Sequence, residues 1–199
     1  MNTEKLVEKW GEFKREEHYF QNGNMPFVSE QARLNVLFDP EDINEVISVF
    51  RDQLDSSILP ELRVFYQEHN GCRLFFGSFC IFGLQRYHDD IFEPYDIVRE
   101  NLNNYAKMTR GARKKSKMVL FATLGGDYVF GYDKTELSKI YCVKAGSAQV
   151  IKEYENFDDF WNYYFDKLLD EYDEECRKIH PNKEDVGIPS LEHLTYRML

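Results

Sequence analysis

The residues best suited to hold a metal are two pairs of histidine and cysteine. His69 and Cys72 lie three positions apart, and Cys176 and His180 lie four apart, which is about one helical turn. Together they could supply four zinc ligands. The first pair, however, crosses the end of a predicted helix, and buried unpaired cysteines are common. The cysteines, Cys80 and Cys142 included, are therefore interpreted as reduced thiols without a metal.

A second candidate for chemistry is the charged segment that contains His88, Asp89, Asp90 and Glu93. These side chains could form an acid–base group or a metal site, but charged loops are usually solvated surface. No serine or cysteine is tied to a base by its position in the sequence. We expect no catalytic residue, metal or cofactor here, and we interpret Asp89, Asp90 and Glu93 as candidate contacts for a partner.

The sequence Gly125-Gly126-Asp127 could belong to a phosphate-binding loop or to a cyclic-dinucleotide synthase. A phosphate loop needs a lysine and a hydroxyl residue at the start of a helix, and this turn leads into an apolar strand. The synthase signature continues with an acid and a phenylalanine, whereas Tyr128 and Val129 follow here. The residues favour a β-hairpin turn.

Charge is distributed unevenly along the chain, whose net charge is −10. Ten acidic residues and one lysine lie in 153–175, and six basic residues without an acid lie in 107–117. The negative field opposes phosphate binding, so we expect a basic protein partner and no nucleic acid. The acidic segment is either the polar face of a surface helix or part of an interface. Its candidate partner-binding residues are Glu153, Glu155, Asp158 and Asp159.

Composition predicts a folded protein with an aromatic core. The chain has 199 residues, which is typical of one domain, and 43% of them are hydrophobic and 16% aromatic. The first twenty residues mix charged and apolar types, and no later apolar run is long enough for a bilayer. We therefore expect no signal peptide, no membrane contact and a cytoplasmic protein.

Two helices are predicted in the first half of the chain. Asp39 is expected to cap the first, with Pro40 in its first turn and its apolar positions continuing to Leu54. Pro60 opens the second, which Asn70-Gly71 ends with the glycine at the left-handed position after the last turn. The residues expected to point inward from the second helix are Leu62, Phe65, Tyr66 and His69.

Strands dominate the middle of the predicted fold. The segment 79–84 is apolar on both faces, as a covered central strand would be. A helix over 94–108 follows, with Ile97, Leu102 and Tyr105 inward. Short connections then predict an antiparallel meander. Its four strands are expected at Met118–Leu124, Asp127–Asp133, Ser138–Lys144 and Ala148–Tyr154.

A last long helix is expected to cover the meander. Asn156 is a suitable N-cap, and the helix should continue to about Arg177. Its apolar positions form a wide stripe of helical period that has Trp161 in the middle. The members of the stripe are Phe157, Phe160, Trp161, Tyr164, Phe165, Leu168, Leu169 and Tyr172.

The ends of the chain read as additions to this domain. We expect a helical extension in 1–38 with Leu6, Trp10 and Phe13 on one face, an α+β domain in 39–175, and a C-terminal extension in 176–199. A short helix is one option within Val186–Leu199. All three parts are expected to pack as one globular unit.

Several short motifs occur in a familiar order. They are the helix at 39–54, Leu59-Pro60, Phe65 and Tyr66 before Asn70-Gly71, Phe82-Gly83-Leu84, Gly125-Gly126-Asp127, and a closing helix that starts with Phe157 and Phe160. Over residues 39 to about 172 the chain resembles the SUKH superfamily. This superfamily includes cell-wall assembly and glucan-synthesis regulators of the yeast type and many bacterial immunity proteins.

The resemblance implies an α+β domain with a curved antiparallel sheet, flanked by helices and without enzymatic activity. The motif residues expected to shape it are Pro60, Asn70, Gly71, Gly83, Gly125, Gly126, Asp127 and Trp161. Bacterial members of the superfamily mostly neutralise toxins, often nucleases, in the cytosol. The expected function is thus an immunity protein that binds a toxin domain encoded nearby. A regulator or scaffold of cell-wall assembly is the alternative.

Overall fold

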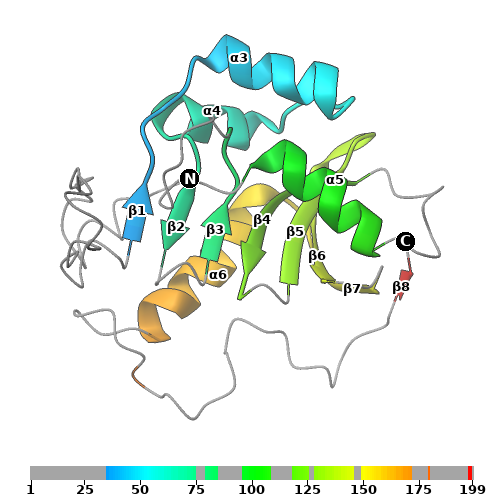
Figure 1. Cartoon of the computed structure of the whole chain (residues 1–199). Coiled ribbons are helices and arrows are strands. Elements are labelled where there is room, and N and C mark those ends of the chain that lie inside the picture. Colours follow the sequence, from blue (N-terminus) through cyan, green and yellow to red (C-terminus); the bar gives the residue numbers. More distant parts are fainter. Residues whose placement is uncertain are drawn as a thin grey trace, which may run out of the picture.

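The computed structural model contains an antiparallel sheet flanked by helices, which confirms the predicted α+β class (Figure 1). Helices lie on both faces of this sheet, so its central strands are covered twice. The residues that the structure describes are 35–74, 79–84, 96–108, 118–125, 128–145, 149–171, 179 and 197–198. The helix predicted within the first twenty residues lies outside them.

The sheet has eight strands in the described residues, and their order along the sheet is their order in the chain. Every neighbouring pair is antiparallel. The predicted meander is confirmed as the four strands β4 to β7. The strands are β1 (Asn35–Leu37), β2 (Cys72–Leu74), β3 (Phe79–Ile81), β4 (Met118–Leu124), β5 (Tyr128–Asp133), β6 (Glu136–Lys144), β7 (Gln149–Tyr154) and β8 (Arg197–Met198).

Three short strands were not predicted. β1 and β2 have three residues each, and β8 has two, so none shows a readable alternation. In β8, Arg197 and Met198 pair with Val150 and Gln149 of β7, and the rest of the segment for which a short helix was one option lies outside the described residues. Both predicted extensions thus contribute a strand to the sheet, and the domain boundaries stay a prediction.

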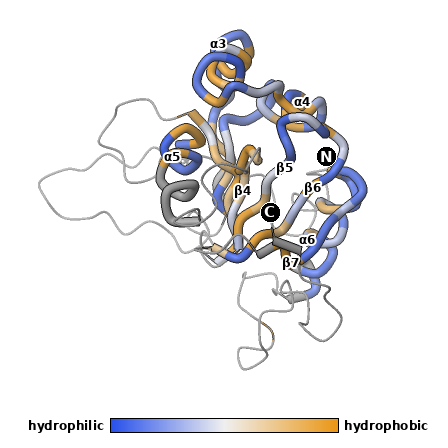
Figure 2. Tube along the Cα trace, turned by 90° about the vertical axis from the view of Figure 1, so that its right-hand side faces the viewer, coloured by the Kyte–Doolittle hydropathy of each residue, from blue (hydrophilic) through white to orange (hydrophobic). Residues whose placement is uncertain are grey.

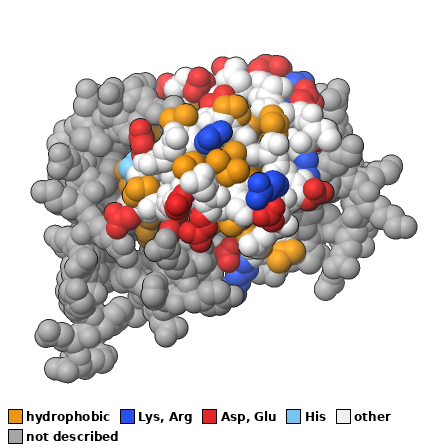
Figure 3. Space-filling view, turned by 90° about the horizontal axis from the view of Figure 1, so that it is seen from above, with side chains coloured by type: hydrophobic (Ala, Val, Ile, Leu, Met, Phe, Trp, Pro, Cys, Tyr) orange, Lys and Arg blue, Asp and Glu red, His pale blue; other side chains and the backbone are white. Residues whose placement is uncertain are grey.

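The helices lie on three sides of the sheet (Figure 1). α5 lies in front of the sheet against β4, α6 lies behind it against β6 and β7, and α3 and α4 lie at the upper end, which Figure 3 shows from above. α3 and α4 mix hydrophilic and hydrophobic residues, as amphipathic helices do (Figure 2). The helices are α3 (Ile43–Ser48), the π-helix η1 (Val49–Gln53), α4 (Pro60–Glu68), α5 (Ile97–Met108) and α6 (Phe157–Glu171).

The first described helix starts later than predicted. Asp42, and not Asp39, is its N-cap, and its side chain accepts a hydrogen bond from the backbone N–H of Asn44 at 2.7 Å. The reason is that Phe38 still exchanges backbone hydrogen bonds with the Asn70-Gly71 segment beside β2. A residue held in strand pairing cannot begin a helix. The predicted single helix to Leu54 is also divided, because η1 follows α3 directly.

α4 agrees with the prediction at its start and on its inner face. Leu62, Phe65 and Tyr66 are buried. The end differs in one detail, because His69 is the C-cap and Gly71 lies two residues beyond it. Gly71 nevertheless has φ +87°, the left-handed backbone that favours glycine.

α5 corrects one predicted core position. Ile97 is buried as expected, but Leu102 is 68% exposed, and the polar Asn101 is buried in its place. The Asn101 amide group donates to the backbone C=O of Leu120 at 2.8 Å, and its oxygen accepts from the Leu120 N–H at 2.9 Å. Leu120 borders the β-bulge of β4, so the amide satisfies a strand where its pairing is irregular. The side chain of Tyr105 lies outside the described part.

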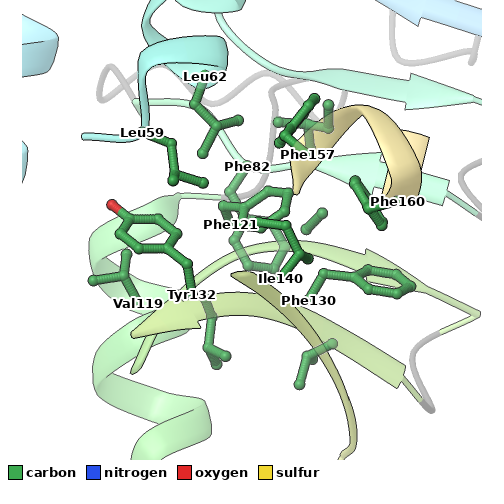
Figure 4. Close-up of a cluster of buried hydrophobic side chains, with 14 of the residues drawn as sticks. Leu59, Leu62, Phe82, Val119, Phe121, Phe130, Tyr132, Ile140, Phe157 and Phe160 are labelled. Carbon is green, nitrogen blue, oxygen red and sulfur yellow. The ribbon is translucent and has the colours of Figure 1, made fainter. Parts of the chain in front are cut away.

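The core joins α6 to the sheet through aromatic rings. Asn156 caps α6 as predicted, because its side-chain oxygen accepts from the Asp159 N–H at 2.8 Å. The ring centroid of Phe160 lies 4.9 Å from that of Phe130 and 5.6 Å from that of Phe121. Figure 4 shows these rings in one cluster with side chains of α4 and the sheet. The buried members of the predicted stripe are Phe157, Phe160, Trp161, Tyr164 and Phe165.

Replacing Trp161 with alanine tests this packing. The side chain is 3% exposed, stacks on Phe165 at a centroid distance of 3.5 Å and contacts Phe79 edge-on at 6.2 Å. Trp161→Ala should lower the free energy of unfolding by about 3 to 5 kcal/mol in a urea titration, because it leaves a cavity. The neighbouring Asn162 is exposed, so Asn162→Ala should change it by less than about 0.5 kcal/mol. Equal effects of the two substitutions would contradict the packing.

Candidate functional site

Four of the predicted partner-binding residues lie around the junction of β7 and α6. Glu153 is half-buried on β7 opposite Tyr141, and Glu155 is exposed in the turn. Asp158 and Asp159 are exposed in the first turn of α6. These carboxylates form a local acidic cluster. The other three predicted residues lie outside the described part of the chain: Asp89, Asp90 and Glu93.

Part of this cluster has a structural role. Asn156 and Asp159 form a reciprocal cap, because the Asn156 amide donates to the Asp159 carboxylate at 3.1 Å while the Asp159 N–H donates to Asn156. Asp158 and Asp159 also complement the positive end of the helix dipole. Asp159 is thus needed by α6 itself. The exposed carboxylates of Glu155 and Asp158 are the better candidates for contact with a partner.

The predicted His–Cys pairs show no metal geometry in the described residues. His69 is half-buried against the Phe65 ring at a centroid distance of 5.6 Å, and burial lowers its pKa. Cys72 is fully buried on β2, and burial raises the pKa of its thiol well above the usual range. The described part of the chain holds no group of three or more His, Cys, Asp or Glu suited to a metal. Cys176 and His180 lie outside it.

The other described cysteines, Cys80 and Cys142, are buried and form no disulfide. Burial raises the pKa of Cys80 to about 11 and that of Cys142 to about 12. Cys142 accepts a long hydrogen bond from the Tyr164 hydroxyl at 3.8 Å. A thiol of such high pKa is almost entirely protonated near neutral pH, so it is a poor nucleophile. These cysteines serve packing.

Asn70 ties three segments together. Its amide group donates to the Leu84 C=O at 3.0 Å and to the Glu41 carboxylate at 3.2 Å, and its oxygen accepts from the Leu84 N–H at 2.7 Å. The side chain thus pairs with the backbone after β3 as a neighbouring strand would. The Asn70 N–H donates to the Phe38 C=O at 3.1 Å. These hydrogen bonds give Asn70 a structural role, because they connect the end of α4 to the segments at Phe38 and Leu84.

Gly83 is the second half of the same junction. A Cβ at this position would lie 2.2 Å from the backbone oxygen of Asn70, which is closer than any real contact. Gly83 also forms a parallel bridge with Asp96, and its C=O accepts from the Ile97 N–H at 2.9 Å. Only glycine therefore allows α4, β3 and α5 to meet here. These residues build the scaffold, and they carry no reactive group.

The glycine turn between β4 and β5 is a hairpin, as predicted. β4 and β5 are antiparallel, and Gly125 at the turn has φ +61°. The Thr123 hydroxyl donates to the Tyr128 C=O at 2.9 Å across the hairpin. Gly126 and Asp127 lie outside the described residues.

The sequence prediction missed a second acidic surface. Residues 39–68, which contain α3, η1 and α4, hold eight acidic residues and two arginines, so their charge is −6. Most of these acids are exposed. The signal is visible in the charge count, although residues 153–175 carry more negative charge. We call the surface formed by residues 39–68 the α3–α4 face.

A model of the SMI1/KNR4 family (SUKH-1) matches residues 38–163. The chain belongs to this family. The match contains the Asn70 and Gly83 junction and most of the aromatic contact between α6 and the sheet. The SUKH resemblance predicted from the motifs is confirmed. The SUKH-1 family covers both immunity proteins and cell-wall regulators, is generally non-enzymatic, and suggests a role in protein–protein interaction.

Searches of curated proteins and of solved structures found no match. Among the described helices, none combines the length and the apolar character needed to cross a membrane.

Asn70→Ala tests the junction of the SUKH-1 scaffold. The substitution leaves the buried N–H and C=O of Leu84 without their side-chain partner, so the free energy of unfolding should fall by about 2 to 4 kcal/mol. Asn44 is exposed on α3, and Asn44→Ala is the matched control with an expected change below about 0.5 kcal/mol. Denaturant titration measures both. A change below about 1 kcal/mol for Asn70→Ala would contradict the assigned role.

Thiol labelling tests the buried cysteines. In a Cys176→Ser background, the folded protein should react with a thiol reagent at pH 8 at least about 100-fold more slowly than the urea-unfolded chain, because the raised pKa removes the thiolate. Raising the pH towards 10 should accelerate the reaction of the folded protein. Labelling of the native protein at nearly the unfolded rate would show that these thiols are accessible.

Proposed function

We propose that this SUKH-1 protein is a non-enzymatic immunity protein of the cytosol, which binds and neutralises a cognate toxin domain encoded nearby. The observation that carries the proposal is the acidic surface of a scaffold whose family includes immunity proteins. The chain has a net charge of −10, and Glu155 and Asp158 are exposed at the start of α6. Such a surface attracts a basic partner.

A nuclease is a suitable class of toxin for this charge. A nuclease must hold a phosphate backbone, so its active-site cleft presents basic side chains. An acidic protein that covers the cleft would occupy the binding site of the nucleic acid. Attraction between opposite charges would also raise the association rate, from about 10⁵–10⁶ to as much as about 10⁸ M⁻¹s⁻¹ at low salt. Fast capture protects a cell that makes the toxin.

The first test is a growth experiment. The toxin domain encoded beside the gene should stop growth when it is expressed alone, and coexpression of this chain should restore growth, because a stable complex blocks the toxin. The two proteins should also copurify. If the chain is well expressed but neither restores growth nor binds the toxin, the proposal is wrong. A wall-stress phenotype in the absence of any toxin would instead support the cell-wall regulator.

A charge-neutral variant tests electrostatic attraction. Glu155→Gln combined with Asp158→Asn removes two exposed charges and keeps the Asn156 cap. Its association rate with the toxin should fall about three- to tenfold at low salt, and the difference should shrink at high salt. Asp170→Asn, twelve residues further along α6 and about 18 Å away, is the control and should have little effect. Equal rates for the variant and the wild type would exclude this cluster.

A further inference from the structure

Negative charge is concentrated on the α3–α4 face as well as in residues 153–175. Its thirty residues carry −6 of the chain's net charge of −10, although they are less than a sixth of its length. Asp42, Glu45 and Glu68 are among the exposed acids. Because the charges share one side of the fold, their potentials add. This face is therefore a strong local source of attraction for a basic partner, in addition to residues 153–175.

One acid of this face, Asp52, is paired with a neighbouring arginine. Arg51 donates to the Asp52 carboxylate at 2.7 Å, and the Ser48 hydroxyl donates to the same group at 2.7 Å. These contacts lower the pKa of Asp52 to about 2. Arg51 and Asp52 neutralise each other, which leaves Arg63 to oppose seven acids on the α3–α4 face. The face keeps its negative potential.

The same face also presents apolar surface. Val64 on α4 is 53% exposed, one of the largest exposures of a large hydrophobic side chain in the described residues. Ile43 and Val49 pack against the core but stay partly exposed. Figure 3 shows hydrophobic side chains in the middle of this surface, with basic side chains beside them and acidic side chains around them. An apolar centre with a polar rim is the usual anatomy of a protein interface.

We propose that the α3–α4 face is a docking surface for a protein partner whose own surface is basic and carries an apolar side chain at its centre. This inference rests on the proposed function, in which the chain binds a protein, and it names a second contact surface in addition to Glu155 and Asp158. The acidic rim attracts the partner and sets its orientation. The area around Val64 then excludes water from the centre of the contact.

Glu68 allows binding to be separated from folding. It is an exposed acid in the last turn of α4, where the helix dipole disfavours negative charge. Glu68→Lys should therefore leave the melting temperature unchanged or raise it. Val64→Lys also keeps a good helix former at an exposed position. Asp170→Lys is the matched control, because Asp170 is likewise an exposed acid in the last turn of its helix, α6.

The experiment measures the dissociation constant of the full-length chain with the toxin domain encoded beside its gene. Glu68→Lys and Val64→Lys should each weaken binding at least about tenfold, and Asp170→Lys less than about twofold. If wild type binds and both α4 variants bind equally well at unchanged melting temperature, the α3–α4 face is not the docking surface. The proposed function would survive that result.

If the wild-type chain does not bind the toxin, the proposed function fails, and the face is tested with a defined probe. The probe is a synthetic helical peptide of lysine and leucine, about 14 residues long, added to the isotope-labelled full chain. Saturable chemical-shift changes centred on 39–68, and lost in Glu68→Lys, would support the docking surface. Saturable changes elsewhere, or none, would overturn it.

Discussion

The contact between Phe160 and the sheet is the interaction on which the rest of this structure depends. Its ring centroid lies 4.9 Å from Phe130 of β5, 5.6 Å from Phe121 of β4 and 5.7 Å from Tyr154 of β7. One side chain of α6 thus contacts three strands of the meander. An antiparallel sheet with one uncovered apolar face is unstable in water, so this contact determines that the strands stay together as one curved layer.

Polar contacts decide where the other helices meet that layer. Asn70 and Asn101 each pair a side-chain amide with one backbone residue, Leu84 and Leu120 respectively. Both side chains satisfy a buried backbone N–H and C=O that a neighbouring strand or water would otherwise have to satisfy. The buried amides of Asn70 and Asn101 therefore hold the helices in place against the sheet. The proposed recognition of a partner instead uses the exposed charge of α3, α4 and the start of α6.

Local signals predicted the parts of the fold that local physics controls. The meander, the Pro60 start of α4, the Asn156 cap and the aromatic stripe of α6 were confirmed, because strand alternation and helix caps involve residues close in the chain. The start of α3 and the burial of Asn101 were not predictable in this way. The first depends on pairing of Phe38 with Gly71, and the second on a bulge in β4. Both partners are distant in sequence.

The candidate site likewise depends partly on the sequence and partly on the tertiary structure. Sequence alone determined that the chain is acidic and rich in aromatic residues, because composition is a property of the chain itself, and its motifs gave the resemblance to the SUKH superfamily. Tertiary structure decided which acids lie together on a surface. It assigned Asp159 to a helix cap and placed α3 and α4 side by side at one end of the sheet. The reason is that a shared electrostatic field depends on distances in space, which only the packed fold determines.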